Sequence, residues 1–373
     1  MRVLWAECKK ICNLKALLLT LVLGLLLYGL FPNGYIGHLW VGRPTADELR
    51  LSLELVERYG GEMDQAEFEE FKRLAADTQK ELDGYVKNNP SCKAAGIDSW
   101  AELQAYEPQS DEEAEEMFRL FDSVHHENME LSYRVQVMNG AVGAYEQMLE
   151  RVEDGELAQP QTSVMPGYMV YNQEYLRYAQ YFIFMALVCV IVLVSPLVTR
   201  DKRARMRELQ YTAHAGRGLL GRQLLAVLLA AFALITVLAA LFVGIYLTEG
   251  TSGLFGCEVA GFQSYYFETW FPITFGQVIA FHVIMMYLMG LGVAAVSFFL
   301  SWLSPNHIVL AALQLPVVVM LYLVCQWMIF EKNGLFSKAR PVYTDPAVTL
   351  GVLLGGLLLA AGVCLWEKRR QIA

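Results

Sequence analysis

Few residues in this sequence have the types and spacing of a chemical site, and the first candidate is a glycine-rich segment. Gly216 to Gly221 have the G-x-x-x-x-G spacing of a phosphate-binding loop. That loop continues with Lys and then Ser or Thr, whereas Arg222 and Gln223 follow here, and it also needs a preceding strand, which the sequence does not predict. We therefore expect no nucleotide-binding site in this chain.

The second candidate is a cluster of metal-ligand types, His125-His126-Glu127. Adjacent side chains on a helix point about 100° apart, so these three cannot easily bind one ion. Asp122 and His126 are better spaced, but they lack further obvious ligands. We interpret the cluster as a solvated helix face.

The seven cysteines are scattered, and several lie in apolar segments. No C-x-x-C pair occurs, so the spacing predicts neither a metal site nor a disulfide framework. A bond between Cys92 and Cys257 remains an open alternative. The apolar segments hold no paired Asp, His–Glu or Ser–Lys set, which disfavours an intramembrane enzyme.

The most distinctive charge pattern lies in residues 200–222, between two apolar segments. Its basic residues are Arg200, Lys202, Arg203, Arg205, Arg207, Arg217 and Arg222. Only Asp201 and Glu208 oppose them. A short loop this basic beside membrane-length segments is retained in the cytoplasm.

The same segment has the pattern of a short amphipathic helix. Met206, Leu209 and Ala213 share one face at helical spacing, and the pattern breaks at Gly216 and Gly218. The segment is either a basic loop that only sets topology or a docking helix for a cytoplasmic partner. We favour the docking helix.

Composition indicates an integral membrane protein with a sizeable polar portion. The chain has 373 residues, 55% of them hydrophobic, and a mean hydropathy of +0.35. Residues 32–176 hold 11 basic and 29 acidic side chains, whereas the remainder holds 18 basic and 9 acidic. An acidic domain is thus attached to a membrane part with basic edges. Nucleic acid is an unsuitable partner for that domain because its phosphates would be repelled.

The fold class that we expect is an all-α integral membrane protein with six transmembrane helices. The predicted spans are 16–31, 178–199, 224–247, about 274–303, 307–330 and 346–366. We divide the chain into 1–15 (cytoplasmic interfacial helix), 16–31 (first span), 32–176 (extracytoplasmic helical acidic domain), 178–199 (second span), 200–222 (cytoplasmic coupling loop), 224–366 (spans three to six) and 367–373 (cytoplasmic tail). Basic residues at the inner segments predict that both termini are cytoplasmic. Loop 331–345 carries three basic residues and disagrees mildly with this topology.

The N-terminal residues 2–15 predict an amphipathic helix at the membrane surface. Its apolar face holds Val3, Leu4, Cys8 and Ile11, and its polar face holds Glu7, Lys9 and Lys10. No small-x-small cleavage site follows the first apolar segment, so we expect an uncleaved span and not a signal peptide.

Residues 44–176 have helical and not strand periodicity. Helices are expected from about Asp47 to Leu55, from about Asp64 to Leu82, from Ser99 to Tyr106 and from Asp111 to about Glu153. The stretch 84–97, which contains Gly84, Pro90 and Gly96, is expected to be a loop.

Ionisable residues inside the predicted spans are scarce. His282 is the one found, beside the neutral Gln277, Gln314 and Gln326. Ion-coupled transporters usually carry the coupling on buried charges, so this scarcity argues against that class. Within the fourth span, glycines at 290 and 292 allow close helix packing.

Loop 248–273 is unusually rich in aromatic residues. They are Phe255, Phe262, Tyr265, Tyr266, Phe267, Trp270 and Phe271. We favour an interfacial aromatic belt over the outer mouth of a pathway for an amphipathic molecule.

The layout and the basic segment together resemble the permease subunits of ATP-binding-cassette (ABC) transporters, of the type-2 exporter class. In that family the loop after the second span carries a pattern close to Glu…Leu-x-x-Thr-x-x-Gly/Ser-Arg…Gly-Lys. Leu209, Thr212, Gly216 and Arg217 fit this pattern, and Arg222 stands near the usual Lys. The acidic docking residue is either Glu208 or Asp201.

The resemblance implies that the first inner loop is a coupling helix that docks on a separate ABC ATPase subunit. Its docking residues would be Glu208, Leu209, Tyr211, Thr212, Gly216 and Arg217. The chain itself would be no enzyme and hold no cofactor, because ATP would bind to the partner. A second permease copy or a homologous permease is also expected.

We therefore expect an exporter subunit for an amphipathic, peptide or lipid-like substrate, in the cell membrane of a bacterium. The alternative is a membrane-anchored sensor or binding protein with an acidic extracytoplasmic domain. An ATPase that co-purifies with the chain would favour the exporter.

Overall fold

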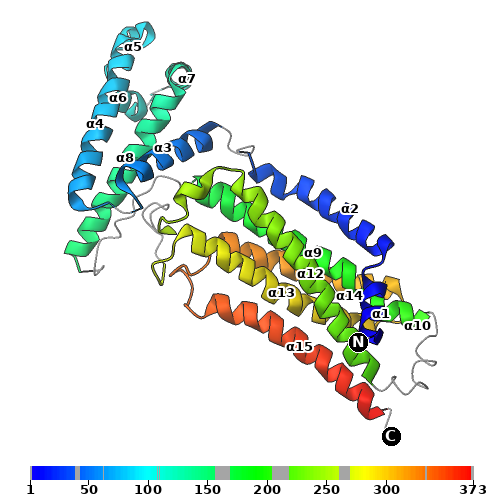
Figure 1. The fold of residues 1–373 in the computed structure, drawn as a ribbon. Helices are drawn as coiled ribbons and strands as arrows, with labels where there is room; N and C mark the ends of the chain where they lie inside the picture. The colour runs from blue at the N-terminus through cyan, green and yellow to red at the C-terminus, as the bar shows by residue number, and fades with distance from the viewer. Residues whose placement is uncertain are drawn as a thin grey trace. The chain divides into compact units, whose positions relative to one another are not determined.

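The computed structural model describes residues 2–37, 43–61, 63–106, 108, 110–155, 169–203, 218–259, 269–331 and 334–370. These residues are mainly helical, and an isolated antiparallel bridge joins Glu258 and Thr274. The chain divides into two compact units (Figure 1). The membrane unit comprises Met1–Trp40, Asn172–Gly250 and Gly276–Ala373, and the polar unit comprises Val41–Tyr171 and Thr251–Phe275.

The described residues hold five helices that are long and apolar enough to cross a membrane. They are Met169–Lys202, Leu219–Leu247 (α12), Phe275–Leu303 (α13), His307–Phe330 and Thr344–Arg369. The last lies in α15, Thr344–Arg370, and the fourth joins α14, His307–Cys325, to the π-helical η6, Gln326–Phe330. The expected all-α class with multiple membrane spans is confirmed at this level.

A sixth span exists if two N-terminal helices count as one. These are α1, Arg2–Ile11, and α2, Leu14–Leu30, which meet at a bend of 43°. Asn13 forms the corner, because its side-chain oxygen caps α2 at Ala16 N while its amide donates to Lys10 O at 2.8 Å. A side chain that satisfies both helix ends favours a sharp bend over a continuous helix.

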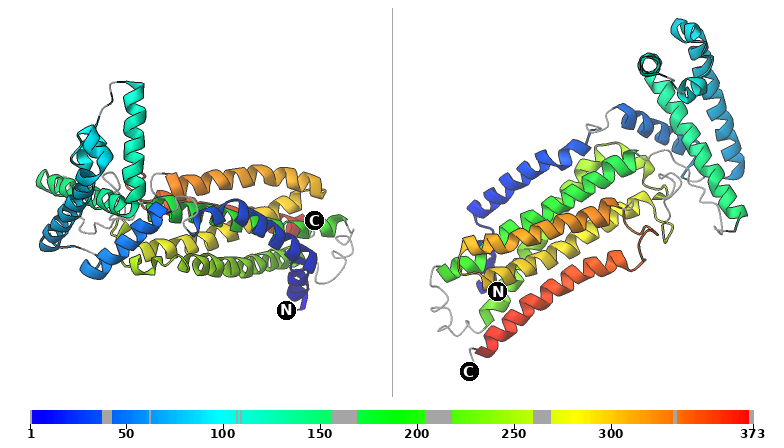
Figure 2. Two further views of the ribbon diagram at one scale, coloured as in Figure 1. Left: turned by 90° about the horizontal axis from the view of Figure 1, so that it is seen from above. Right: turned by 180° about the vertical axis from the view of Figure 1, so that it is seen from behind.

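The central helix of the membrane unit is α9, Leu176–Val194, which continues η2 (Met169–Tyr175) and leads into α10 (Pro196–Arg203). It packs against α2, α12 and α14 (Figure 2). Tyr178 stacks on Phe242 of α12 and donates its hydroxyl hydrogen to the Phe242 carbonyl at 2.9 Å. The buried phenol is thus satisfied, as a polar atom among apolar helices must be.

Glycine allows α13 and α15 to approach at backbone distance. A Cβ at Gly292 would lie 2.5 Å from the Val352 carbonyl oxygen, and one at Gly356 would meet the Gly292 carbonyl. The predicted close packing at Gly292 is confirmed. Gly290 also faces a neighbour, since a Cβ there would meet the Ile235 side chain of α12.

One end of the membrane unit gathers α1, α10, the start of α12 and the end of α15 (Figures 1 and 2). We call it the basic end, because the basic segment 200–222 begins and ends there. The opposite end holds the turn between η6 and α15. There Arg340 is 3% exposed and donates to the carbonyls of Trp327 and Met328, and it pairs with Asp345 at 3.2 Å. One basic residue of loop 331–345 is therefore a buried structural group and not a surface charge.

The polar unit contains six α-helices in its described residues. They are α3 (Arg43–Tyr59), α4 (Gln65–Asn88), α5 (Pro90–Ala95), α6 (Trp100–Ala105), α7 (Asp111–Glu127) and α8 (Met129–Glu153). Asp64 and Glu67 form a reciprocal capping box at the start of α4. Ser99 and Ser110 cap α6 and α7 through their side-chain oxygens.

Two features of the polar unit differ from expectation. The single helix expected from Asp111 to Glu153 is broken at Asn128, which separates α7 from α8. The expected loop 84–97 is largely helical, because α4 runs on to Asn88 and α5 begins at Pro90. Proline at a first helical position starts a helix well, since its missing N–H would have no partner there.

The polar unit has an aromatic and aliphatic core. Phe68 of α4 stacks on Tyr145 of α8, with ring centroids 3.7 Å apart. A second cluster lies where α4, α5, α6, α7 and α8 meet, and it includes Trp100 and Cys92. The described parts of loop 248–273 also belong to this unit from Thr251 onward, where η4 (Thr251–Leu254) packs against α3.

Candidate functional site

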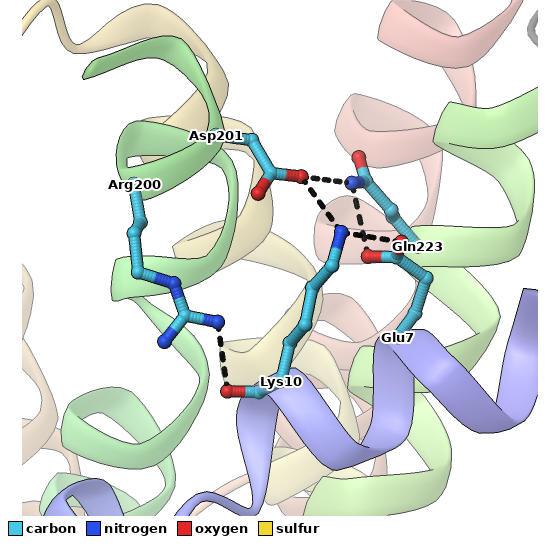
Figure 3. Close-up of polar contacts among 5 residues, drawn as sticks. All are labelled: Glu7, Lys10, Arg200, Asp201 and Gln223. Atoms are coloured by element: carbon cyan, nitrogen blue, oxygen red, sulfur yellow. Dashed lines mark hydrogen bonds and ion pairs between the residues drawn. The ribbon is translucent and has the colours of Figure 1, made fainter. Parts of the chain in front are cut away.

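The candidate site lies at the basic end, where α1 crosses α10 and the first turns of α12. The chain leaves α10 after Arg203 and returns at Gly218, so residues 204–217 connect these two helices. Four polar side chains hold this junction, and we call them the base cluster: Glu7, Lys10, Asp201 and Gln223 (Figure 3).

Lys10 and Gln223 each bind both carboxylates of the base cluster. The Lys10 ammonium donates to Glu7 Oε1 at 2.7 Å and to Asp201 Oδ2 at 3.3 Å. The Gln223 amide donates to Glu7 Oε2 at 3.1 Å and to Asp201 Oδ2 at 2.8 Å. The four side chains form a closed ring of hydrogen bonds that joins three helices, α1, α10 and α12.

Burial makes this ring energetically important. Glu7 and Gln223 are each 3% exposed and Asp201 is 8% exposed. Buried carboxylates are destabilising unless opposite charge and hydrogen-bond donors compensate them. One ammonium and one amide compensate two carboxylates here, so the ring retains one negative charge beside a strongly basic segment.

Arg200 adds a link between α10 and α1. Its guanidinium donates to the Lys10 carbonyl at 2.9 Å, in the last turn of α1 (Figure 3). The final carbonyls of a helix lack partners within the helix and carry partial negative charge. Arg200 therefore stabilises the end of α1 and fixes it to α10.

A second set of contacts fixes α10 to the turn between α13 and α14. Thr199 donates its hydroxyl hydrogen to the Ser301 carbonyl at 3.1 Å. The Lys202 ammonium donates to the carbonyl oxygens of Trp302 and Ser304. We call these residues the turn anchor. Through the base cluster and the turn anchor, the flanks of 204–217 are connected to α1, α12 and α13.

The six predicted docking residues all lie outside the described residues. They are Glu208, Leu209, Tyr211, Thr212, Gly216 and Arg217. Asp201, the alternative acidic docking residue, is described, and it is buried and bound by Lys10 and Gln223. Its carboxylate is therefore bound within the membrane unit.

Sequence reasoning missed two members of the base cluster. Glu7 was expected on the polar face of the N-terminal helix, but it is buried. The signal was present, because Val3, Glu7 and Ile11 recur every four residues and so lie on one face. Gln223 stands at the border of an apolar segment, where a polar residue gives no pattern of its own.

The histidine cluster of the polar unit has two different environments. His125 accepts or donates a hydrogen bond with Ser132 Oγ at 2.8 Å and stacks on Phe121, and burial lowers the pKa of this imidazole. His126 lies on the exposed face, 3.3 Å from Asp122. Among the described residues, no group of three His, Cys, Asp or Glu side chains could hold a metal ion.

The cysteines of the polar unit are free thiols. Cys92 lies in the core cluster, and Cys257 is packed near Gly61. Burial raises the pKa of both thiols, that of Cys257 to about 11. Both thiols are free in this structure, so no bond joins Cys92 to Cys257, and burial disfavours the reactive thiolate form of each.

The end of the membrane unit opposite the basic end carries a second polar group. Tyr175 and His282 share a buried hydrogen bond of 2.6 Å. The helix through α9 begins at Met169, so Glu174 and Arg177 also belong to it, beyond the expected span 178–199. Its 34 residues extend about 51 Å, well over the roughly 30 Å of a hydrocarbon core. These charges at its first turns therefore need not lie in hydrocarbon.

No protein-family model, no curated protein and no solved structure matches this chain.

Proposed function

We propose that this chain is the membrane-spanning permease subunit of an ATP-driven ABC exporter. A separate ATPase subunit binds and hydrolyses ATP, and this chain moves the substrate. The basic segment 200–222 docks on that ATPase, with Leu209 as the apolar anchor and Glu208 and Arg217 as charged contacts. The sequence pattern of this segment and the multi-span helical fold both agree with the proposal.

The observation that supports the proposal best is the way in which the basic segment is attached. A loop that only marked topology would need charge and no rigid base. Here the base cluster joins both ends of 204–217 to each other and to α1, and the turn anchor joins α10 to the turn after α13. A displacement of the segment would therefore move several membrane helices together, as coupling to ATP hydrolysis requires.

The proposed topology puts the basic end in the cytoplasm and the acidic polar unit outside. The burial of Arg340 supports it, because a paired guanidinium inside the fold contributes little to the charge bias of loop 331–345. We further propose a second permease copy, since a single chain of six spans rarely encloses a pathway, and an amphipathic substrate.

The test is co-purification of the full chain with an ABC ATPase from its native host. We expect a complex whose ATP hydrolysis is altered by substrate. Leu209→Asp should weaken the association or uncouple hydrolysis from export, because a truncated interface anchor typically costs about 1–3 kcal/mol. Arg203→Ala is the control and should leave both unchanged. A chain that never associates with an ATPase would favour the membrane-anchored sensor instead.

A further inference from the structure

An apolar groove runs along the membrane unit between α2, α9 and α12, and we call it the lateral groove. It has a volume of about 620 Å³. It extends from Cys12 and Ala230, nearest the basic end, to Tyr28 and Ile245 at the far end. All three helices are candidate membrane spans or part of one, so the groove faces the hydrocarbon of the bilayer.

The lining of the lateral groove offers water too few hydrogen-bond partners for water to be its occupant. Leu21, Leu25 and Val237 line it and are 56%, 63% and 58% exposed. Water fills a cavity only where it finds several polar partners. The hydroxyl of Thr20, one of the few polar side chains of the lining, already donates to the Ala16 carbonyl at 2.9 Å.

The shape of the lateral groove suits a lipid chain. Its α2 wall extends about 17 Å from Leu17 to Tyr28, because an α-helix rises about 1.5 Å per residue. An acyl chain has no polar groups, so it can lie along an apolar wall of this length without leaving a hydrogen-bonding group unsatisfied.

Charge at one end of the groove identifies the headgroup. Arg222 is exposed and lies on α12 about three turns before Ala233, which lines the groove, so the two share a face. Arginine at such a position can form paired hydrogen bonds to a phosphate. A phospholipid satisfies both the apolar groove and this cation, and a net negative charge on the lipid strengthens the attraction to Arg222 by about 1 kcal/mol.

We propose that the lateral groove binds one acyl chain of an anionic membrane phospholipid, whose phosphate lies at Arg222. The lipid fills the space between α2 and α12 and so supports the packing of α2 on the bundle. This site does not depend on the exporter function, since a resident lipid would serve a sensor equally well.

The experiment is native mass spectrometry of the full chain after exposure to equal amounts of phosphatidylglycerol and phosphatidylcholine. The wild-type protein should retain one phospholipid, with phosphatidylglycerol favoured about fivefold, as expected for one basic residue near a lipid surface. Arg222→Gln should retain a lipid but lose this preference. A preference that survives Arg222→Gln would overturn the headgroup position.

Groove-filling variants test the acyl chain itself. Ala233→Trp, and independently Val237→Trp, should abolish lipid retention. The matched control is Ala312→Trp, at an exposed position on α14, outside the lining of the groove. It should retain lipid like the wild type. Lipid retention by both groove variants would overturn the proposal. A lipid-free dimer of the wild type that Ala233→Trp dissociates would also overturn it, because a second copy of the chain would then occupy the groove.

Discussion

Gln223 and Asp201 are 22 positions apart in the sequence, yet the Gln223 amide donates to Asp201 Oδ2 at 2.8 Å. This contact joins the end of α10 to the first turns of α12. The basic segment thus leaves and re-enters the membrane unit at one fixed point. A loop with a fixed base transmits displacement to the helices that flank it more directly than a freely hinged one.

Replacing the amide of the base cluster should destabilise the membrane unit. Gln223→Leu removes one hydrogen-bond donor from each of the two buried carboxylates. A buried polar group without its partner lowers the free energy of unfolding by about 1–3 kcal/mol. We expect a lower melting temperature of the detergent-purified chain. Gln326→Leu is the control, because its amide donates to an exposed partner, Glu331, and should change the melting temperature little. Equal melting of wild type and Gln223→Leu would contradict a structural role for the ring.

The charges of the base cluster should behave as a coupled set. Lys10→Met leaves Glu7 and Asp201 without their cation, and we expect a loss below the roughly 3–5 kcal/mol of a fully buried pair, because the Lys10 side chain is 29% exposed. Adding Glu7→Gln to Lys10→Met removes one of the two negative charges and should restore part of the stability. A double-mutant cycle of thermal unfolding measures this coupling, and strictly additive effects would argue against it.

The α13–α15 contact gives a prediction with neighbouring positions as test and control. Gly356→Ala inserts a methyl group against the Gly292 carbonyl, and overpacking typically costs about 1–3 kcal/mol. Gly355→Ala meets nothing within 4 Å and should be neutral or stabilising by up to about 1 kcal/mol, because alanine favours helix over glycine. The melting temperatures of the two variants should therefore move in opposite directions. A parallel change would show that α15 does not pack on α13 as described.

Local signals predicted much of the helical structure. Helices were expected to begin near Asp64, Ser99 and Asp111, and helices do begin there, capped by the side chains of Asp64, Ser99 and Ser110. Breaks without glycine or proline were not predictable, and Asn128, which separates α7 from α8, is the example. Asparagine is common in turns, but this single residue gave too little signal against the strong helical period on both sides.

The burial of Glu7 could have been predicted from its spacing, but the pairing within the base cluster could not. Glu7 and Gln223 are 216 positions apart, and no spacing rule connects them. Their pairing arises because α1 folds back across α12, and the bend at Asn13 makes this possible. The lateral groove is a similar case, since it depends on how far α2 stands from α12 and not on the apolar residues themselves.

The last prediction concerns which face of the membrane the polar unit occupies. Under the proposed topology, Ser91→Cys should react with a membrane-impermeant maleimide added to intact cells, because Ser91 is exposed on α5. The native thiols Cys92 and Cys257 should contribute little background, since burial raises the pKa of both. Lys368→Cys, exposed near the end of α15, is the matched control and should react only after lysis. The reverse pattern would place the basic end outside the cell and remove the docking segment from any cytoplasmic ATPase.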